Sequence, residues 1–351
     1  MSRISRPDPE LTHRLSRRGM LGVAAGTTAA ALLGAVAPSA TAATGKAAAP
    51  VPAPAAGGGR PVLPPGRLGV QLYSLRDKVA TLGFAPVFDE LEKYGYDEIE
   101  FAGYTQDAVG PITLAQLRRL AKNHGLTPIG SHVTYYSSDP NAYTFAQNLT
   151  RVLDDAEALG LKHIGTASSP FRYGSTVDAW KRAAEEFNAY GAAAKARGMK
   201  FYQHNHSDEF SFASDDPEVR LYDVLLAETD PDLVYLEMDI YWAYAGQFRF
   251  SRRPDGTPAP FEPLDYALEH SHRYPLFHVK DGVSDPSNQY GYRMVDVGDG
   301  DIDYERFLSA VTRLRGERLA HHWQTEHDSP PDPFTFARRS STYLHSLRER
   351  H

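Results

Sequence analysis

The 351-residue sequence contains no cysteine, and this absence excludes disulfide bonds, a thiolate metal site and a cysteine nucleophile. It also lacks an excess of positive charge, because 37 Lys and Arg residues stand against 44 Asp and Glu residues, for a formal net charge of −7. This balance does not favour binding to nucleic acid, so we expect no nucleic acid partner. A hydrophobic content of 42% and a charged content of 23% are ordinary for a soluble globular enzyme.

The N-terminal segment has the layout of an export signal. Arg17 and Arg18 precede an apolar run rich in alanine, and the small residues Ala40 and Ala42 form an A-x-A cleavage signal. Residues 1–42 thus resemble a bacterial twin-arginine signal peptide, which predicts a protein that is exported or held in the cell envelope. A membrane anchor and a disordered tail are the alternatives. Because the run is short for a spanning helix, we expect cleavage without stable membrane insertion.

The rest of the chain divides into a linker and one domain. Residues 43–66 are rich in Ala, Pro and Gly with almost nothing to bury, so we expect a disordered linker. Residues 67–351 form the predicted catalytic domain, in which strand-like runs alternate with amphipathic helical segments. The runs span residues 68–75, 96–103, 126–133, 161–168, 200–206, 233–242, 275–282 and 321–328. Eight such units predict an α/β fold, a (β/α)8 TIM barrel. An open doubly wound sheet is the alternative, but its usual glycine-rich phosphate turn is missing.

The alternation of side chains along the strands predicts which residues point into the barrel. In the run 233–242, Val234, Leu236 and Met238 form an apolar face for the surrounding helices, which leaves Asp239 on the inner face. The same reasoning points these side chains inward: Glu100, either His204 or His206, His278, Lys280 and Glu326. Barrel enzymes build their sites at the C-terminal ends of the strands, so these groups should converge there. Converging imidazoles and carboxylates can ligate a divalent cation, which would also offset the cost of burying them together.

Several motifs at the strand ends match one family in order and spacing. They are GVQLYSLRD, EFAG, HNHSDEF, MDIYW, FHVKD, VGDGDID and TEHD, and HVKD followed by GDGDID is the most specific pair. Through them, residues 67–345 resemble the xylose-isomerase-like barrels known as sugar phosphate isomerases/epimerases. The resemblance implies one divalent metal ion at the barrel mouth, with manganese expected and zinc, magnesium or cobalt as alternatives. The ligands that it implies are His204, Asp239, His278 and Glu326.

The resemblance also implies a sugar isomerase or epimerase, in which a base removes the proton next to a carbonyl and the metal stabilises the enediolate. Many family epimerases carry a glutamate as the ligand from strand five, whereas this chain has a histidine. This difference favours the branch that acts on 3-keto-sugars, so a lyase or hydratase that cleaves 3-keto-glycosides by β-elimination is the alternative. The implied proton-transfer residues are Glu326, His206, Lys280 and Glu209. The implied substrate-binding residues are Tyr73, Glu100, His132 and Trp242.

Two functions of other classes compete with this reading. An endonuclease of related barrel type would act at abasic DNA with three metal ions. The acidic charge, the export signal and the few candidate ligands on strands two to four argue against it. A non-catalytic carbohydrate-binding barrel is the other, and the intact set of Asp239, His278 and Glu326 argues against it. We therefore expect a small sugar or glycoside as the partner, and the oligomeric state, a homo-oligomer included, stays open.

Overall fold

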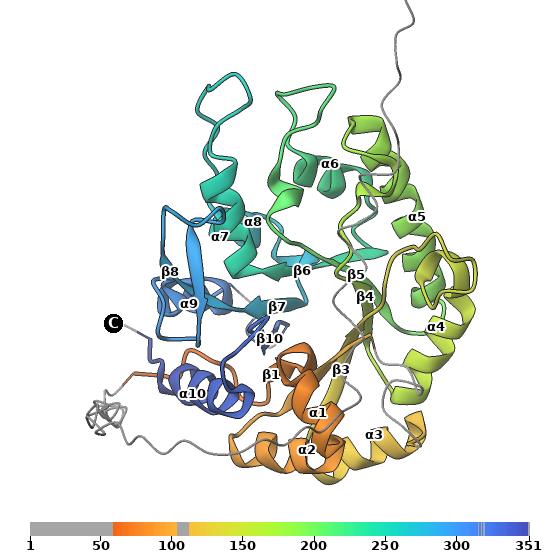
Figure 1. The fold of residues 1–351 in the computed structure, drawn as a ribbon, viewed down its shortest axis with the longest axis vertical. Coiled ribbons are helices and arrows are strands. Elements are labelled where there is room, and N and C mark those ends of the chain that lie inside the picture. The colour runs from red at the N-terminus through yellow and green to blue at the C-terminus, as the bar shows by residue number, and fades with distance from the viewer. Residues whose placement is uncertain (1–58, 104–111, 315, 317, 319, 350–351) are drawn as a thin grey trace, which may run out of the picture. The chain divides into compact units, whose positions relative to one another are not determined.

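The described part of the chain forms a closed barrel of parallel strands with helices around it (Figure 1). The computed structural model describes residues 59–103 and 112–349 apart from 315, 317 and 319, so the predicted export signal lies outside the described residues. The strands follow one another around the barrel in the order β1-β10-β7-β6-β5-β4-β3-β2. They are β1 (Leu68–Gln71), β2 (Glu98–Ala102), β3 (Thr127–His132), β4 (His163–Thr166), β5 (Lys200–His204), β6 (Val234–Asp239), β7 (Leu276–Val279) and β10 (His322–Thr325). The predicted (β/α)8 barrel is confirmed, and each barrel strand lies within one predicted run.

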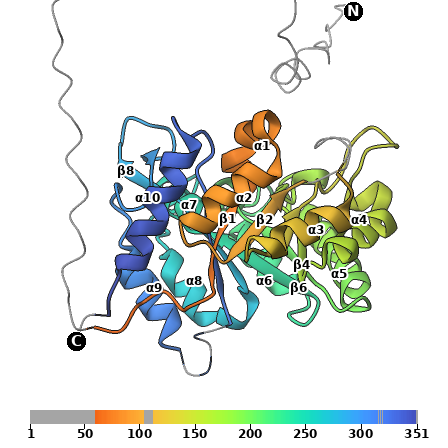
Figure 2. The ribbon, with the colours of Figure 1, turned by 90° about the horizontal axis from the view of Figure 1, so that it is seen from below.

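The helices cover the outer face of the barrel. They are α1 (Arg76–Leu82), α2 (Phe84–Lys93), α3 (Leu114–Asn123), α4 (Phe145–Leu159), α5 (Val177–Lys195), α6 (Leu221–Glu228), α7 (Ile240–Arg249), α8 (Pro263–Glu269), α9 (Tyr304–Thr312) and α10 (Pro333–Ser346). The last helix, α10, lies against α2 and so joins the end of the ring to its beginning (Figure 2). None of the helices within the described residues is both long and apolar enough to cross a lipid bilayer.

The N-termini of the helices follow rules that are visible in the sequence. Thr113 caps α3 through a capping box, in which its hydroxyl accepts a hydrogen bond from the Gln116 backbone amide and the Gln116 side chain accepts one from the Thr113 amide. Thr176 caps α5 by accepting from the Ala179 amide. These caps satisfy backbone donors that the first helical turn leaves unpaired, and they fix where each βα loop ends.

The apolar core lies between the strands and the helices. Val234, Leu236 and Met238 on β6 are fully buried, as their alternation predicts. On neighbouring strands Trp323 stacks on Phe277, with ring centroids 4.6 Å apart. Burying one side chain of this kind contributes about 1.5–3 kcal/mol to stability. The outward residues therefore hold the barrel together, and the inward polar residues are free to form a site.

Two predicted strands end earlier than the sequence suggests. The run 233–242 ends as a strand at Asp239, and helix α7 begins at the next residue because the Asp239 carboxylate accepts a hydrogen bond from the Trp242 amide at 2.9 Å. The run 275–282 ends as a strand at Val279. The chain then enters an antiparallel hairpin of β8 (Asp281–Ser284) and β9 (Tyr292–Val295), which the sequence did not predict.

The predicted linker also ends early. We expected disorder through Gly66, but Val62 is 0% and Leu63 is 5% exposed, and both belong to the main apolar core. The amide of Val62 donates to the Leu347 carbonyl at 3.2 Å, and Pro61 pairs with Arg348 in an isolated bridge. Two apolar residues among the prolines thus pack into the core and place this segment beside the C-terminus. The rest of the predicted linker lies outside the described residues.

Candidate active site

A cavity of about 420 Å³ opens at the C-terminal ends of the barrel strands. Its lining residues come from the ends of several strands and from the loops that follow them. They are Tyr73, Ala102, Gly103, His132, Val133, Thr134, Ala167, Ser168, His204, His206, Lys280, Glu326, Asp328 and Ser329. Polar and ionisable side chains dominate this lining, so the cavity suits a small polar molecule.

Three of the predicted metal ligands lie together beneath the cavity, and Glu326 is the one of them that lines it. Asp239, His278 and Glu326 each offer one ligand atom within 4.8 Å of the others, and all three are buried. His278 Nδ1 lies 2.6 Å from Glu326 Oε2 and 3.9 Å from Asp239 Oδ2. The register of the sheet explains this meeting, because Asp239 and His278 are paired neighbours on β6 and β7.

His204 joins this group, whereas His206 lies to one side. His204 Nε2 is 3.6 Å from Asp239 Oδ2. Asn205 fixes this arrangement, because its amide oxygen accepts from the Asp239 backbone N–H at 3.1 Å and its amide nitrogen donates to the Asp239 carbonyl at 3.2 Å. This two-bond clamp ties the end of β5 to the end of β6. Of the two histidines in HNH, His204 therefore has the geometry of a ligand, and His206 lines the cavity.

Lys280 places a buried ammonium group beside the same carboxylates. Its Nζ lies 2.9 Å from Asp239 Oδ2, 2.9 Å from Glu326 Oε2 and 2.8 Å from Asp328 Oδ1. Burial opposes the charge, but these three acids raise the pKa of Lys280 well above its ordinary value. Lys280 is therefore a permanent cation that can donate to an oxygen in the cavity.

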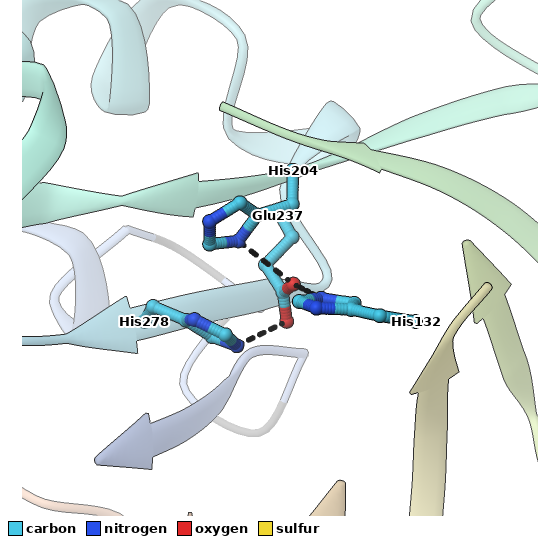
Figure 3. A group of neighbouring side chains, drawn as sticks. All are labelled: His132, His204, Glu237 and His278. Carbon is cyan, nitrogen blue, oxygen red and sulfur yellow. Dashed lines mark hydrogen bonds and ion pairs between the residues drawn. The ribbon is translucent and has the colours of Figure 1, made fainter. Parts of the chain in front are cut away.

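A second layer of ionisable groups lies under the cavity. Figure 3 shows Glu237 at the centre of three imidazoles: its Oε2 is 2.6 Å from His132 Nε2 and 3.2 Å from His204 Nδ1, and its Oε1 is 3.2 Å from His278 Nε2. Glu100 Oε2 lies 2.7 Å from His278 Nε2. Both glutamates are completely buried. The predicted role of Glu100 as a substrate contact does not match this position, because it lies beneath the lining residues.

The charges at the base of the cavity depend on this crowding. Burial raises the pKa of Asp239 to about 6, although Lys280 and His278 act in the opposite direction. Burial would raise the pKa of Glu326 too, but Lys280 and His278 outweigh it and hold that pKa well below its usual range. Burial and the nearby His278 lower the pKa of His204 far below its ordinary value. His204 is therefore neutral, the form in which imidazole binds a metal ion.

The remaining predicted site residues lie around the cavity or behind its wall. Tyr73 lies at the mouth and is 41% exposed, in keeping with a substrate contact. Trp242 packs behind His206, with ring centroids 5.8 Å apart, and is not among the lining residues. Glu209 is buried beneath the HNH segment, where it accepts from the Ser169 hydroxyl at 2.6 Å and from the His206 amide at 2.9 Å. It supports His206 from outside the cavity, a position that does not favour direct proton transfer to a substrate.

The four implied ligands fit a divalent cation. Two imidazole nitrogens and two carboxylates form a donor set that suits transition-metal ions such as zinc or manganese. Asp239 Oδ2 and His278 Nδ1 are buried, and neither makes an aligned hydrogen bond within the described residues, although charged groups lie within ion-pair distance. Buried polar atoms without a hydrogen bond are rare in folded proteins. A cation between them would satisfy both atoms.

The fold and the site together define a (β/α)8 barrel protein with a polar pocket at the C-terminal face of the barrel and a cluster of possible metal ligands beneath it. The chain belongs to the xylose isomerase-like TIM barrel family, whose model matches residues 88–332. The sequence has no match among curated proteins.

Solved structures show the same fold at low sequence identity. A sugar phosphate isomerase/epimerase from Parabacteroides distasonis superposes with a TM-score of 0.60 at 22% identity, over 80% of this chain and 94% of that one. A probable 3-DHS dehydratase from Bacillus anthracis gives 0.58 at 12% identity, over 79% and 98% of the two chains. The IOLI protein with a bound zinc atom gives 0.56 at 14% identity, over 79% and 94%. At such identities the likeness establishes the fold and leaves the reaction to be argued from the site.

Three residues of the site were not singled out from the sequence. Glu237 lies on the inner face of β6, as the alternation indicates, but its contact with three histidines depends on the depth of each side chain in the barrel. Asn205 forms the clamp on Asp239, and Asp328 completes the cage around Lys280. Two of them stand within motifs quoted above, Asn205 in HNHSDEF and Asp328 in TEHD, and Glu237 shares the inner face with Asp239 two positions on.

Proposed function

We propose that the protein is a metal-dependent isomerase or epimerase that acts on an unphosphorylated keto-sugar. The observation that carries this proposal is the buried cluster of Asp239, His278 and Glu326, with His204 Nε2 3.6 Å from Asp239, beneath an open polar cavity that Glu326 and His204 line. These residues would hold the ion. A divalent cation there would supply Lewis-acid polarisation of a sugar carbonyl and would place the sugar oxygens.

The chain's own residues supply the proton transfers. His206 and Glu326 line the cavity and carry a nitrogen and a carboxylate that can remove the proton next to the carbonyl. The electron pair of that C–H bond moves toward the carbonyl, and the positive charge of Lys280 stabilises the oxygen that gains negative charge. Return of the proton to the other face gives the epimer, and return to the neighbouring carbon gives the isomer. Loss of a β-oxygen instead would cleave a glycoside, the alternative outcome of the same first step.

The charge of the cavity supports an unphosphorylated substrate. Lys280 is the one lysine or arginine among the described residues that line the cavity, and three carboxylates already surround it. Two arginines of neighbouring loops are paired with acids, Arg172 with Glu186 at 2.9 Å and Arg249 with Asp208 at 2.7 Å, and Arg76 at the mouth donates to the Tyr73 carbonyl. A phosphate group binds best to arginine side chains and to backbone N–H groups that have no other hydrogen-bond partner. We also propose that the predicted export signal brings the protein to sugars found outside the cytoplasm.

The test measures exchange of the substrate's α-proton with solvent deuterium. The protein is stripped with a chelator, reloaded with manganese or zinc, and incubated with matched pairs of free and phosphorylated keto-sugars and with 3-keto-glycosides. We expect deuterium incorporation that requires the metal and favours the free sugars, and the product separates epimerisation from elimination. Equal activity of the stripped and reloaded protein would contradict the metal-dependent mechanism. A preference for the phosphorylated member of each pair would contradict the substrate class.

A further inference from the structure

The two buried glutamates under the cavity have no part in the proposed proton transfers, although burying a carboxylate is costly. Glu100 and Glu237 are both 0% exposed. Each lies beside one of the histidine ligands implied above: Glu100 Oε2 is 2.7 Å from His278 Nε2, and Glu237 Oε2 is 3.2 Å from His204 Nδ1. Both contacts are made at the ring nitrogen that points down into the barrel.

The other ring nitrogen of each histidine faces the acids at the base of the cavity. His204 Nε2 lies 3.6 Å from Asp239 Oδ2, and His278 Nδ1 lies 2.6 Å from Glu326 Oε2. Each imidazole therefore stands between one deep carboxylate and one carboxylate of the proposed metal site. The nitrogen that faces the proposed metal site is Nε2 in His204 and Nδ1 in His278.

A neutral imidazole carries its proton on one nitrogen and offers a lone pair on the other, and the partner of the protonated nitrogen decides which is which. A carboxylate accepts hydrogen bonds and donates none when it is ionised. As hydrogen-bond acceptors, Glu237 thus holds the proton of His204 on Nδ1 and Glu100 holds the proton of His278 on Nε2. The lone pairs are then left on His204 Nε2 and His278 Nδ1, the atoms that face Asp239 and Glu326.

We propose that Glu100 and Glu237 are positioning residues that fix the tautomer and the orientation of His278 and His204 for metal binding. This inference rests on the metal site of the proposed function. Carboxylates behind metal-binding histidines raise the basicity of the ligands and hold the rings in place. Many family epimerases carry a glutamate ligand on strand five, where this chain has His204. The hydrogen bond to Glu237 gives the His204 ring some of the negative charge that a glutamate ligand would bring.

The deep layer is cross-linked, which makes it a rigid support. His132 Nε2 lies 2.6 Å from Glu237 Oε2 and 3.4 Å from Glu100 Oε1, so it bridges the two carboxylates. The Tyr202 hydroxyl donates to Glu100 Oε1. These hydrogen bonds hold both glutamates under the rings.

The same deep groups could in principle hold an ion themselves, because His132, His204, Glu237 and His278 offer ligand atoms within 4.8 Å of one another. The short contact between His132 and Glu237 favours direct hydrogen bonding, since it lies in the range of a charge-assisted hydrogen bond. A second ion in this layer would make Glu237 a ligand, and the experiment below separates the two arrangements.

The experiment compares metal binding by three Glu→Gln variants: E100Q, E237Q and, as the matched control, E98Q. Glu98 is also a buried acid of β2, but it pairs with His322 at 2.7 Å at the other end of the barrel. Gln keeps the shape of Glu, but its amide can donate as well as accept, so it no longer fixes the tautomer. Zinc stoichiometry and affinity are measured by competition with a coloured chelator, without any substrate. We expect one ion per chain, an affinity loss of about 10–100-fold for E100Q and E237Q, and none for E98Q.

A second measurement needs no variant. Histidine ¹⁵N NMR spectra of the zinc-loaded protein report the tautomer of each ring, and we expect the proton of His204 on Nδ1 and that of His278 on Nε2. The opposite tautomers, equal affinities for all four proteins, or a second ion that E237Q removes would each overturn the inference. Expected zinc binding without sugar turnover would leave the inference standing and refute the proposed function, so the two failures are distinguishable.

Discussion

Replacing Asp281 by Asn should free the loop that follows the β8–β9 hairpin. Asp281 is 1% exposed, and its carboxylate collects four backbone N–H groups. Oδ1 accepts from Gly282 at 2.8 Å and from Ile302 at 3.3 Å, and Oδ2 accepts from Gly298 at 2.9 Å and from Gly300 at 3.2 Å. This arrangement explains why HVKD and GDGDID occur together, because the acid of the first motif binds the backbone of the second.

The size of the effect follows from the donors and acceptors. Asn offers one oxygen, so two of the four N–H groups would face an NH₂ group that cannot accept, and the charge is lost as well. A buried donor without a partner costs about 1–3 kcal/mol, so two of them should destabilise the loop by about 2–6 kcal/mol. At 1.4 kcal/mol per factor of ten, amides that open through this loop should exchange about 30-fold faster or more.

Hydrogen exchange read by mass spectrometry on the peptide around residues 296–303 measures this opening directly. D285N is the matched control, because Asp285 lies in the same hairpin and its Oδ1 accepts mainly from the neighbouring Ser287. We expect D285N to exchange like the natural protein in this peptide. Exchange in D281N that stays within a factor of two of the natural protein would refute the role assigned to the carboxylate.

Three further predictions concern acid stability, the Asn205 clamp and the buried ammonium. Burial lowers the pKa of His163 to about 3, below its unfolded value, so the unfolded state binds the extra proton between about pH 6.5 and pH 3. The contribution of neutral His163 to the free energy of unfolding should therefore be fully present above pH 6.5 and be lost as the pH falls. H163Q should reduce the slope of the urea unfolding midpoint against pH in this acidic range; an unchanged slope would contradict this. N205D keeps the acceptor for the Asp239 amide, but it places a carboxylate oxygen against the Asp239 carbonyl. We therefore expect the free energy of unfolding to fall by about 1–3 kcal/mol and zinc binding to weaken. Unchanged zinc affinity would be evidence against the clamp. K280M leaves the buried acids without their cation, so the free energy of unfolding of the metal-free protein should fall by about 3–5 kcal/mol. Zinc should then raise the melting temperature of K280M by more than it raises that of the natural protein; equal increases would contradict this.

The sequence was informative where one property repeats along a strand. The outward face of β6 follows from alternation, and the C-terminal ends of the strands locate the site. The β8–β9 hairpin was missed because one carboxylate and backbone amides hold the loop after it, and this leaves no periodic pattern. Val62 was missed because two apolar residues in a proline-rich segment give too little signal.

The deep layer shows a different limit. Alternation assigns Glu237 and Glu100 to the inner face, but it does not say how far below the cavity each one lies or which nitrogen it meets. These depend on the stagger between strands, which sets His204 beside Glu237 and Asp239 beside His278. The stagger arises from the closure of the whole barrel, a property that no short stretch of sequence carries.

Asp239 ends a strand and caps helix α7 through Oδ1, while its Oδ2 faces the proposed metal site. The connection from β6 to α7 has therefore been reduced to a single residue. Loops normally absorb insertions and so allow related barrels to acquire new specificities, but an extra residue here would pull the helix away from the carboxylate that starts it. Diversification of this scaffold should therefore concentrate in longer connections, such as the one between β3 and α4, while the sixth one stays constant in length.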